Sequence, residues 1–363
     1  MRRNEGIDAL RMCSMFMVVV LHVLAQGSIL SNVGESPYSV NYQVAWFLET
    51  MAFCAVNCFA LISGYVGVKS QFHYYKGVIL WLQVVFWTVS ITVIYEITKP
   101  EVVGIRQWIK AVLPVSMQEY WYVTSYFCMF LFIPFMNKLL IHLNRTELKV
   151  LGITIVAGVS FFPTFVMHDL YTLHGGYTFI WLAMLYLLGG VIQRLEFGKE
   201  IRKITLFLIY IGAVVLSWGI KFILERHPIS SVSSNFLINY TSPTMLICAV
   251  SLVLLFARTE FRTEGVKKLI KAASPLAFSV YIIHTNPLVW DYWLSGRYAF
   301  AAGKTPVVLV GIVIGKAVLI YIACSLADMI RLFLFKKLKL VEIGKKIEKT
   351  MQQYKIKRFL NIF

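Results

Sequence analysis

The sequence has little charge for its length and lacks the common catalytic signatures. Only 15% of its 363 residues are charged and 58% are hydrophobic, whereas a soluble domain carries roughly 25% charged residues. No glycine-rich phosphate loop, HExxH pair or GxSxG elbow occurs. The composition therefore argues against a soluble enzyme, and any chemistry is expected to depend on histidine.

The cysteines also lack the spacing of a metal site or of a disulfide framework. All six lie in apolar stretches, where cysteine acts as a small packing residue. We expect no bound metal. The cysteines are Cys13, Cys54, Cys58, Cys128, Cys248 and Cys324.

Long apolar runs are what the sequence has instead. Runs of roughly 18 or more residues recur along the chain, which is typical of a polytopic membrane protein. The first run is not a signal peptide, because it contains charged groups and no small-residue cleavage pattern follows it. We predict an all-α protein with about ten transmembrane helices, at 8–27, 44–65, 77–97, 120–137, 150–168, 177–193, 203–222, 243–257, 274–294 and 306–331.

The basic residues predict the orientation. The net charge is +17, and with both termini in the cytoplasm, 27 of the 35 Lys and Arg fall on the inner side and seven on the outer side. Inner loops of membrane proteins carry such an excess. The charge therefore indicates topology and contact with anionic lipid, and nucleic acid is not an expected partner.

Two regions are expected. Residues 1–331 form a ten-helix membrane domain, and residues 332–363 form a basic cytoplasmic tail in which leucine, isoleucine and phenylalanine alternate with lysine. The tail is either an interfacial amphipathic helix or a solvated basic segment. Neither alternative makes it catalytic.

The first span contains the most informative polar residues. Arg11 and His22 are eleven residues apart, which is three helical turns to within about 20° and about 16 Å along the axis. Both side chains are thus expected on one face, with Asp8 one turn before Arg11 and able to pair with it. The alternative is that Arg11 extends to the headgroups and His22 only packs. The shared face favours a functional stripe.

Other polar residues allow two interpretations. His284 lies in the middle of the ninth span, as a packing histidine or as part of a site. Trp121 and Tyr122 open the fourth span, as an interfacial aromatic belt or as a surface for a sugar ring.

Two further groups of polar residues are expected to be structural. Lys316 and Asp328 are twelve residues apart in the last span, about 120° around the helix, so they should contact other helices rather than each other. His168, Asp169 and His174 cluster in an outer turn and are expected to be solvated loop residues rather than metal ligands.

Four segments together resemble acyltransferase family three, the bacterial membrane acyltransferases that modify cell-surface glycans. Arg11 and His22 match its Arg, ten residues, then His. The segment at 58–69 is similar to its Phe-x-x-x-Ser-Gly-Tyr motif. The similar segments, in order, are IDALRMCSMFMVVVLH, CFALISGYVGVK, WYVTSYFCMFLFIPFMN and ASPLAFSVYIIH.

The resemblance implies a reaction and its co-substrates. Such a protein lies in the bacterial cytoplasmic membrane and takes an acyl group from cytosolic acyl-coenzyme A to a hydroxyl of a cell-surface or lipid-linked glycan. Acetyl-coenzyme A is the expected co-substrate, with succinyl as the alternative acyl group, and no bound cofactor is expected. Lipid, the glycan acceptor and envelope-glycan assembly proteins are the expected partners.

Residue roles follow from the same resemblance. Arg11, with Lys69 and Lys76, would attract the phosphates of coenzyme A. Alternatively, Arg11 would orient the thioester and so belong with His22 to the catalytic residues. His22 would act either as general base on a sugar hydroxyl or as the group that carries the acyl unit. Some members place paired arginines where this chain has the two lysines. The residues expected to support the acceptor site are Trp121, Tyr122 and His284.

A membrane transporter or flippase is the competing function. The polar residues within the spans would then form an ion or substrate pathway. The sequence shows no clear inverted repeat and no pair of broken helices, which favours the enzyme.

Overall fold

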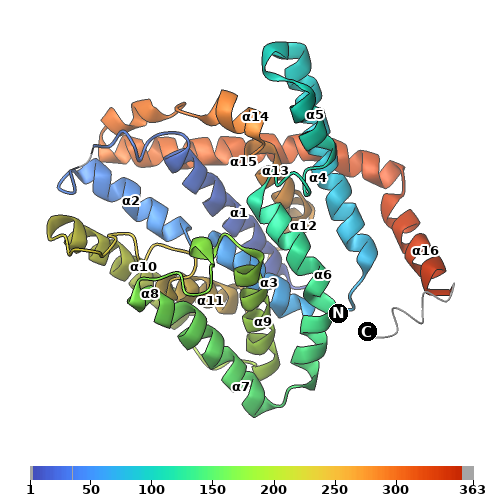
Figure 1. Ribbon diagram of the computed structural model, residues 1–363, viewed down its shortest axis with the longest axis horizontal. Coiled ribbons are helices and arrows are strands. Elements are labelled where there is room, and N and C mark those ends of the chain that lie inside the picture. The colour runs from blue at the N-terminus through green and yellow to red at the C-terminus, as the bar shows by residue number, and fades with distance from the viewer. Residues whose placement is uncertain (1–2, 35, 354–363) are drawn as a thin grey trace.

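The computed structural model describes residues 3–34 and 36–353, and these form a bundle of helices (Figure 1). A π-helical segment, Thr154–Phe161, joins α7 to α8, and a second one, Trp290–Leu294, follows α14. The helices are α1 (Glu5–Ala25), α2 (Val40–Ala52), α3 (Ala55–Gly67), α4 (Tyr74–Thr98), α5 (Ile105–Val112), α6 (Trp121–His142), α7 (Arg145–Ile153), α8 (Phe162–Val166), α9 (Phe179–Leu195), α10 (Lys203–Arg226), α11 (Pro243–Ala257), α12 (Glu264–Ala273), α13 (Ala277–His284), α14 (Pro287–Val289), α15 (Pro306–Lys337) and α16 (Leu340–Gln353).

Helix α1 is central to the bundle. Asn4 caps it by accepting a hydrogen bond from the Ile7 N–H at 3.0 Å, and Glu5 and Asp8 lie in its first turn, where negative charge complements the helix dipole. Leu24, near its other end, is fully buried. The helices that pack against α1 include α2, α3, α11, α13 and α15.

The predicted spans coincide with helices, but not all of these are long enough to cross a membrane. Within the described residues, seven helical segments meet the length and composition of a span. Helices α9 and α11 are apolar but shorter, and the ninth predicted span, 274–294, is interrupted after His284. The all-helical membrane protein is confirmed, while the count of ten and the orientation stay predictions. The seven segments are Glu5–Ala25, Val40–Gly67, Tyr74–Thr98, Trp121–His142, Arg145–Val166, Lys203–Arg226 and Pro306–Lys337.

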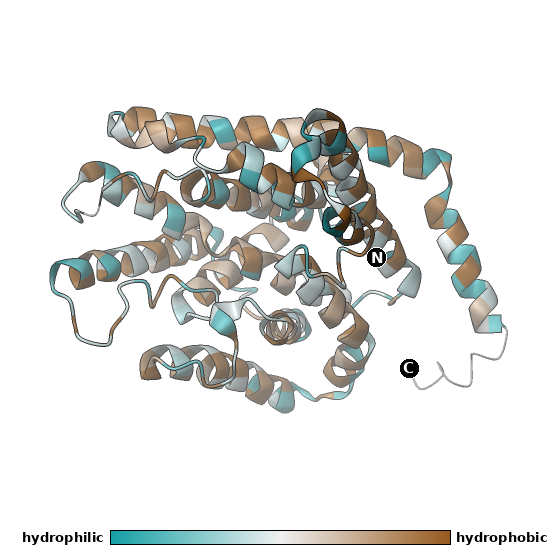
Figure 2. Cartoon of the chain, turned by 45° about the horizontal axis from the view of Figure 1, so that its top comes forward, coloured by the Kyte–Doolittle hydropathy of each residue, from teal (hydrophilic) through white to brown (hydrophobic). Residues whose placement is uncertain are grey.

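Several of these helices are apolar along most of their length, as the brown ribbons of Figure 2 show. Large exposed apolar side chains cover α15 on one side of the bundle. A water-exposed surface of this kind is rare on soluble monomers, and contact with lipid tails accounts for it. The exposed side chains of α15 include Leu319, Ile322, Leu326, Ile330 and Phe333.

Helices α3 and α9 approach each other closely because glycines line their contact. A Cβ added at Gly64 would lie 1.8 Å from the Tyr186 carbonyl oxygen, and one at Gly189 would lie 2.2 Å from the Leu61 carbonyl oxygen. Small residues permit such backbone contact in membrane bundles, where packing rather than hydrophobic burial holds helices together.

A buried ion pair within α15 is joined to α4 by a hydrogen bond. Asp328 accepts two hydrogen bonds from Arg331, at 2.7 and 2.6 Å, and one from the Trp87 indole N–H of α4 at 2.7 Å. Asp328 therefore does contact another helix, as predicted, and its charge is balanced within its own helix. All three side chains are buried, so the pair is fully satisfied rather than free to move an ion.

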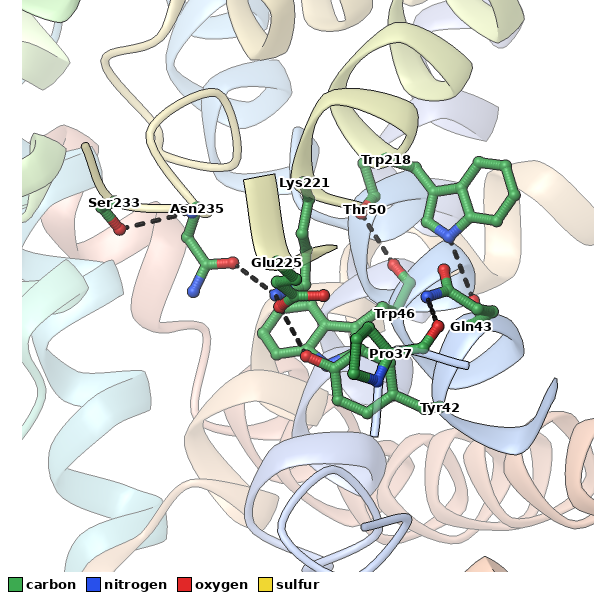
Figure 3. Close-up of polar contacts among 10 residues, drawn as sticks. All are labelled: Pro37, Tyr42, Gln43, Trp46, Thr50, Trp218, Lys221, Glu225, Ser233 and Asn235. Carbon is green, nitrogen blue, oxygen red and sulfur yellow. Dashed lines mark hydrogen bonds and ion pairs between the residues drawn. The ribbon is translucent and has the colours of Figure 1, made fainter. Parts of the chain in front are cut away.

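A polar cluster anchors the loop that follows α10 (Figure 3). Lys221 is 2% exposed, and its ammonium lies 3.6 Å from the centre of the Trp46 ring of α2. It donates hydrogen bonds to Glu225 and, at 2.9 Å, to Asn235 of the loop. Tyr42 donates to the same Glu225 carboxylate at 2.6 Å. Helix α2, helix α10 and the loop are thus held together by one compensated lysine.

The predicted tail begins inside α15, which continues to Lys337. Helix α16 then packs on α4, where Glu348 accepts hydrogen bonds from the Tyr74 backbone N–H at 2.7 Å and from His73 at 3.1 Å. Its alternating polar and apolar residues are visible in Figure 2. The predicted tail also includes residues 354–363, which lie outside the described part of the chain. Its position at the membrane interface stays a prediction.

The glycine contact between α3 and α9 generates a stability prediction. Gly64→Ala should lower the melting temperature in detergent by several degrees, because a methyl group at 1.8 Å from a backbone oxygen forces the helices apart at a cost of about 1–3 kcal/mol or more. Gly212→Ala in α10 is the matched control, since a Cβ there meets no atom within 4 Å. It should leave the melting temperature unchanged or raise it slightly. Equal melting temperatures for the two variants would contradict the close packing.

Candidate active site

Two histidines that are far apart in the sequence meet in the structure. The Nδ1 atom of His22 in α1 lies 2.8 Å from the Nε2 atom of His284 at the end of α13, and the ring centres are 5.0 Å apart. Helices α1 and α13 pack against each other along this contact. The structure therefore combines two of the histidines that the sequence had singled out separately.

The hydrogen bonds around the pair assign its protons. His284 Nδ1 lies 2.5 Å from the Val280 carbonyl oxygen, which only accepts, so His284 Nδ1 carries the hydrogen. In the neutral ring His284 Nε2 is then an acceptor, and His22 Nδ1 must donate to it. This leaves the remaining nitrogen of neutral His22, Nε2, with a free lone pair.

The two histidines differ in accessibility. His284 is 1% exposed, whereas His22 is only partly buried. The Trp290 ring packs edge-on against His22 with ring centres 4.7 Å apart, and Gln26 donates to the Trp290 carbonyl oxygen at 3.3 Å. His22 is consequently the more exposed member of the pair, and His284 is the buried member that supports it.

A break in the helix follows His284 directly. Asn286 starts α14 by accepting a hydrogen bond from the Leu288 N–H at 3.1 Å, and its amide donates to the Tyr120 hydroxyl at 3.0 Å. Tyr120 in turn donates to the Ile282 carbonyl oxygen at 3.0 Å. These bonds satisfy backbone groups that the interruption would otherwise leave unpaired. Non-helical backbone at membrane depth is tolerated where protein or a cavity surrounds it.

Arg11 lies in the first half of the same helix as His22. It pairs with Asp8 at 2.6 Å, as the sequence predicted, and Asp8 also pairs with Arg3. Asp8 is 3% exposed. One buried carboxylate thus balances one of two arginines, and the group retains a net positive charge beside the start of α1.

The two lysines predicted to bind the donor lie at the same end of the bundle. Lys69 follows the end of α3 and Lys76 lies in the first turn of α4, and both side chains are exposed. Helices α2 and α3 return along α1, so the α3–α4 loop and Arg11 are at one end and His22 is toward the other. Within the described part of the chain no hydrogen bond or ion pair joins these cations to one another, and their role in binding stays a prediction.

The two aromatic residues at the start of α6 pack against different neighbouring rings. The Tyr122 ring lies 6.0 Å from the Tyr281 ring, which lies 6.4 Å from His284. Trp121 packs instead on Tyr177 of the loop before α9, with ring centres 4.6 Å apart. Tyr122 is therefore one ring removed from the histidine pair, and Trp121 belongs to a neighbouring aromatic cluster.

The cluster of His168, Asp169 and His174 has a structural explanation. Asp169 accepts hydrogen bonds from the Leu173 and His174 backbone N–H groups at 2.6 and 2.7 Å, which stabilises the turn. In residues 3–34 and 36–353, no three His, Cys, Asp or Glu side chains are grouped to hold a metal ion. The six cysteines are free thiols, and four of them are buried.

Sequence reasoning did not identify Trp290, Tyr281 or the break at Asn286. Tyr281 precedes His284 by three residues and so shares its helix face, which was a usable signal. Asn286 followed by Pro287 is a typical helix start, since asparagine caps and proline favours the first turn. That signal lay inside an apolar run, and the run was read as one continuous span.

Comparison with known proteins places the chain. A family model described as an acyltransferase domain matches residues 4–326. Neither a curated protein nor a solved structure matches the chain. The matched range contains Arg11, His22 and His284 and extends into α15, so it covers nearly the whole helix bundle. The chain belongs to acyltransferase family 3 and is an integral-membrane acyltransferase.

Proposed function

We propose that this protein moves an acetyl group from cytosolic acetyl-coenzyme A to a hydroxyl of a cell-surface or lipid-linked glycan. The observation that carries the proposal is the 2.8 Å contact between His22 and His284, anchored at the Val280 carbonyl oxygen. It leaves a free lone pair on Nε2 of His22, the more exposed histidine of the pair. A hydroxyl acceptor requires such a base, because an alcohol is a weak nucleophile until its proton is removed.

The general-base reaction uses only these groups. His22 Nε2 takes the proton of the sugar hydroxyl as the oxygen bonds to the carbonyl carbon of the thioester. The carbon–sulfur bond then breaks, and the sulfur of coenzyme A leaves with the proton from His22. While His22 is a cation, its Nδ1–H donates to neutral His284 Nε2, a charge-assisted hydrogen bond that is stronger than the one in the resting state.

An acyl relay begins at the same nitrogen. His22 Nε2 would attack the thioester carbon and release the coenzyme A thiolate, and the sugar hydroxyl would then displace the imidazole, its proton going to the thiolate. The two routes differ in one observable, because only the relay forms an acetylated protein in the absence of acceptor. Acid quenching after exposure to radiolabelled acetyl-coenzyme A distinguishes them.

The cationic end of the bundle supports a donor with phosphates. Coenzyme A carries a pyrophosphate and a 3′-phosphate, and guanidinium groups bind phosphate with paired hydrogen bonds. Arg3 and Arg11 share the single carboxylate of Asp8, so this group of three side chains keeps one positive charge. Lys69 and Lys76 are exposed at the same end of the bundle. We assign the phosphates to this end, the thioester to His22, and this end to the cytosol because the basic residues predict it.

The transporter alternative is less well supported by the structure. It would place the intramembrane arginine and histidine, Lys316 and Asp328 in one polar pathway. Asp328 is instead bound by Arg331 and Trp87 in a buried and fully paired arrangement. That arrangement favours a structural role for the carboxylate.

His22→Ala should abolish acetyl transfer, with a loss of at least about 10²–10⁴-fold, because it removes the base or the acyl carrier. The measurement is incorporation of radiolabelled acetyl from acetyl-coenzyme A into envelope glycan by isolated membranes. His142→Ala is the matched control, since His142 is an exposed histidine in the last turn of α6. Full acetylation by His22→Ala would sink the catalytic assignment.

His284→Ala should lower kcat by about 10- to 100-fold, since a hydrogen bond to a charged group contributes about 1.5–3 kcal/mol. The KM for acetyl-coenzyme A should stay within about twofold, because the phosphates bind elsewhere. His284→Gln should restore part of kcat, as its amide oxygen can accept from His22 Nδ1. A Gln variant as slow as the Ala variant would argue against the hydrogen-bond role.

Arg11→Ala should raise the KM for acetyl-coenzyme A by about tenfold or more, because it removes a charge-assisted contact to phosphate. Asp8 keeps its pair with Arg3, so the start of α1 should stay folded. Acetyl-3′-dephospho-coenzyme A shows which phosphate Arg11 contacts. If Arg11 binds the 3′-phosphate, the wild type should have a raised KM for this donor, and Arg11→Ala should raise that KM no further. An unchanged KM in Arg11→Ala would remove Arg11 from donor binding.

A further inference from the structure

A polar pocket lies beside the helix break. It is bounded by the second half of α4, by α5 and by the segment that contains α14, and it encloses about 130 Å³. Most of its lining residues are polar, and six of them carry the argument: Thr92, Gln107, Lys110, Glu119, Asn286 and Asp291.

The segment after His284 connects the pocket to the histidine pair. Asn286, two residues beyond His284, lines the pocket and is held by Tyr120. Trp290 packs against the His22 ring, and the next residue, Asp291, also lines the pocket. Helix α14 packs on α4, so one short segment borders both the pocket and the surroundings of the pair.

The charges in the pocket nearly cancel. Lys110 and Glu119 form an ion pair at 3.0 Å, and the exposed Asp291 is balanced by Lys99, whose ammonium lies 5.7 Å from the centre of the Tyr292 ring that lines the pocket. The pocket therefore has no surplus cation to bind a phosphate or a uronic acid, whereas a neutral ring with several hydroxyls would find both donors and acceptors. The exposed Tyr292 ring adds an aromatic surface of the kind that sugar rings use.

Helix α5 places the pocket at the level of the lipid headgroups. Thr88 donates a hydrogen bond to the Ala111 carbonyl oxygen at 2.6 Å and fixes α5 to α4. Gln107 and Lys110 face the pocket, while Ile105 and Ile109 are 77% and 44% exposed on the outside. An amphipathic helix at the end of a membrane span lies with its apolar face in the membrane interface.

We infer that this pocket binds the acceptor as an uncharged sugar unit, and that it does so at the membrane surface opposite the cationic end. The inference rests on the proposed transfer reaction and adds the place and the charge class of the acceptor. A lipid-linked sugar and a sugar of a finished polysaccharide share this chemistry. The position at the interface makes both accessible to the pocket, and the two sources are separated by experiment.

The test uses the full chain in proteoliposomes with radiolabelled acetyl-coenzyme A. One arm contains the chloroform–methanol extract of the host membranes as acceptor, and the other contains the water-soluble envelope polysaccharide. Asp291→Asn and Thr92→Val should each raise the KM for whichever fraction is acetylated, by about tenfold and a few-fold respectively. The KM for acetyl-coenzyme A should be unchanged.

Thr98→Val is the matched control for Thr92→Val. Both threonines lie in α4 and donate to the carbonyl oxygen four residues earlier at 2.8 Å, but Thr98 is exposed outside the pocket. Thr98→Val should keep the wild-type KM for acceptor. Labelled sugars released by mild acid should pass through an anion exchanger if the modified unit is neutral.

Each outcome decides the inference. If the wild type transfers acetyl and both pocket variants keep its KM for acceptor, the pocket is not the acceptor site. If the label is found only on sugars that bind the anion exchanger, the acceptor is not an uncharged sugar. In either case the transferase itself stands. If the wild type transfers to neither fraction, the proposed function fails and the acceptor site fails with it.

Discussion

The hydrogen bond from His22 to His284 is the interaction on which the proposed site depends. It joins α1 to a short helix 262 residues away and determines which imidazole nitrogen is basic. The Val280 carbonyl oxygen completes the relay, because a carbonyl accepts and so defines the proton on His284. In a largely dry interior no water competes for these positions, and a fixed tautomer has greater value there than it would at a hydrated surface.

The interruption after His284 is the structural cost of this arrangement. If the helix continued past His284, Thr285 and Asn286 would extend it in the same direction, and the chain would pass the site without turning. The break exposes backbone groups, and the structure satisfies them through Asn286 and the Tyr120 hydroxyl. One turn thereby ends α13 at His284, presents Trp290 to His22, and forms a wall of the polar pocket.

Local regularities in the sequence account for what could be predicted. The helical phase of Arg11 and His22 and the pairing of Asp8 with Arg11 depend on one helix, and the apolar runs predicted most helices. The contact between His22 and His284 depends on how helices pack, which periodicity does not encode. The pocket is harder still, because Thr92, Gln107, Glu119 and Asp291 come from separate segments and each resembles an ordinary polar residue.

The separation along α1 has a physical consequence for a charged donor. Arg11 and His22 are about 16 Å apart along one helix, with the cations at one end and the histidine pair toward the other. Moving phosphates to the pair would require removing several charges from water, at a cost of many kcal/mol. A donor whose charges stay at the Arg11 end and whose thioester extends to His22 avoids that cost. If the acceptor binds in the polar pocket, as proposed, it approaches His22 from the side of the break, and the two substrates meet without either one crossing the bundle.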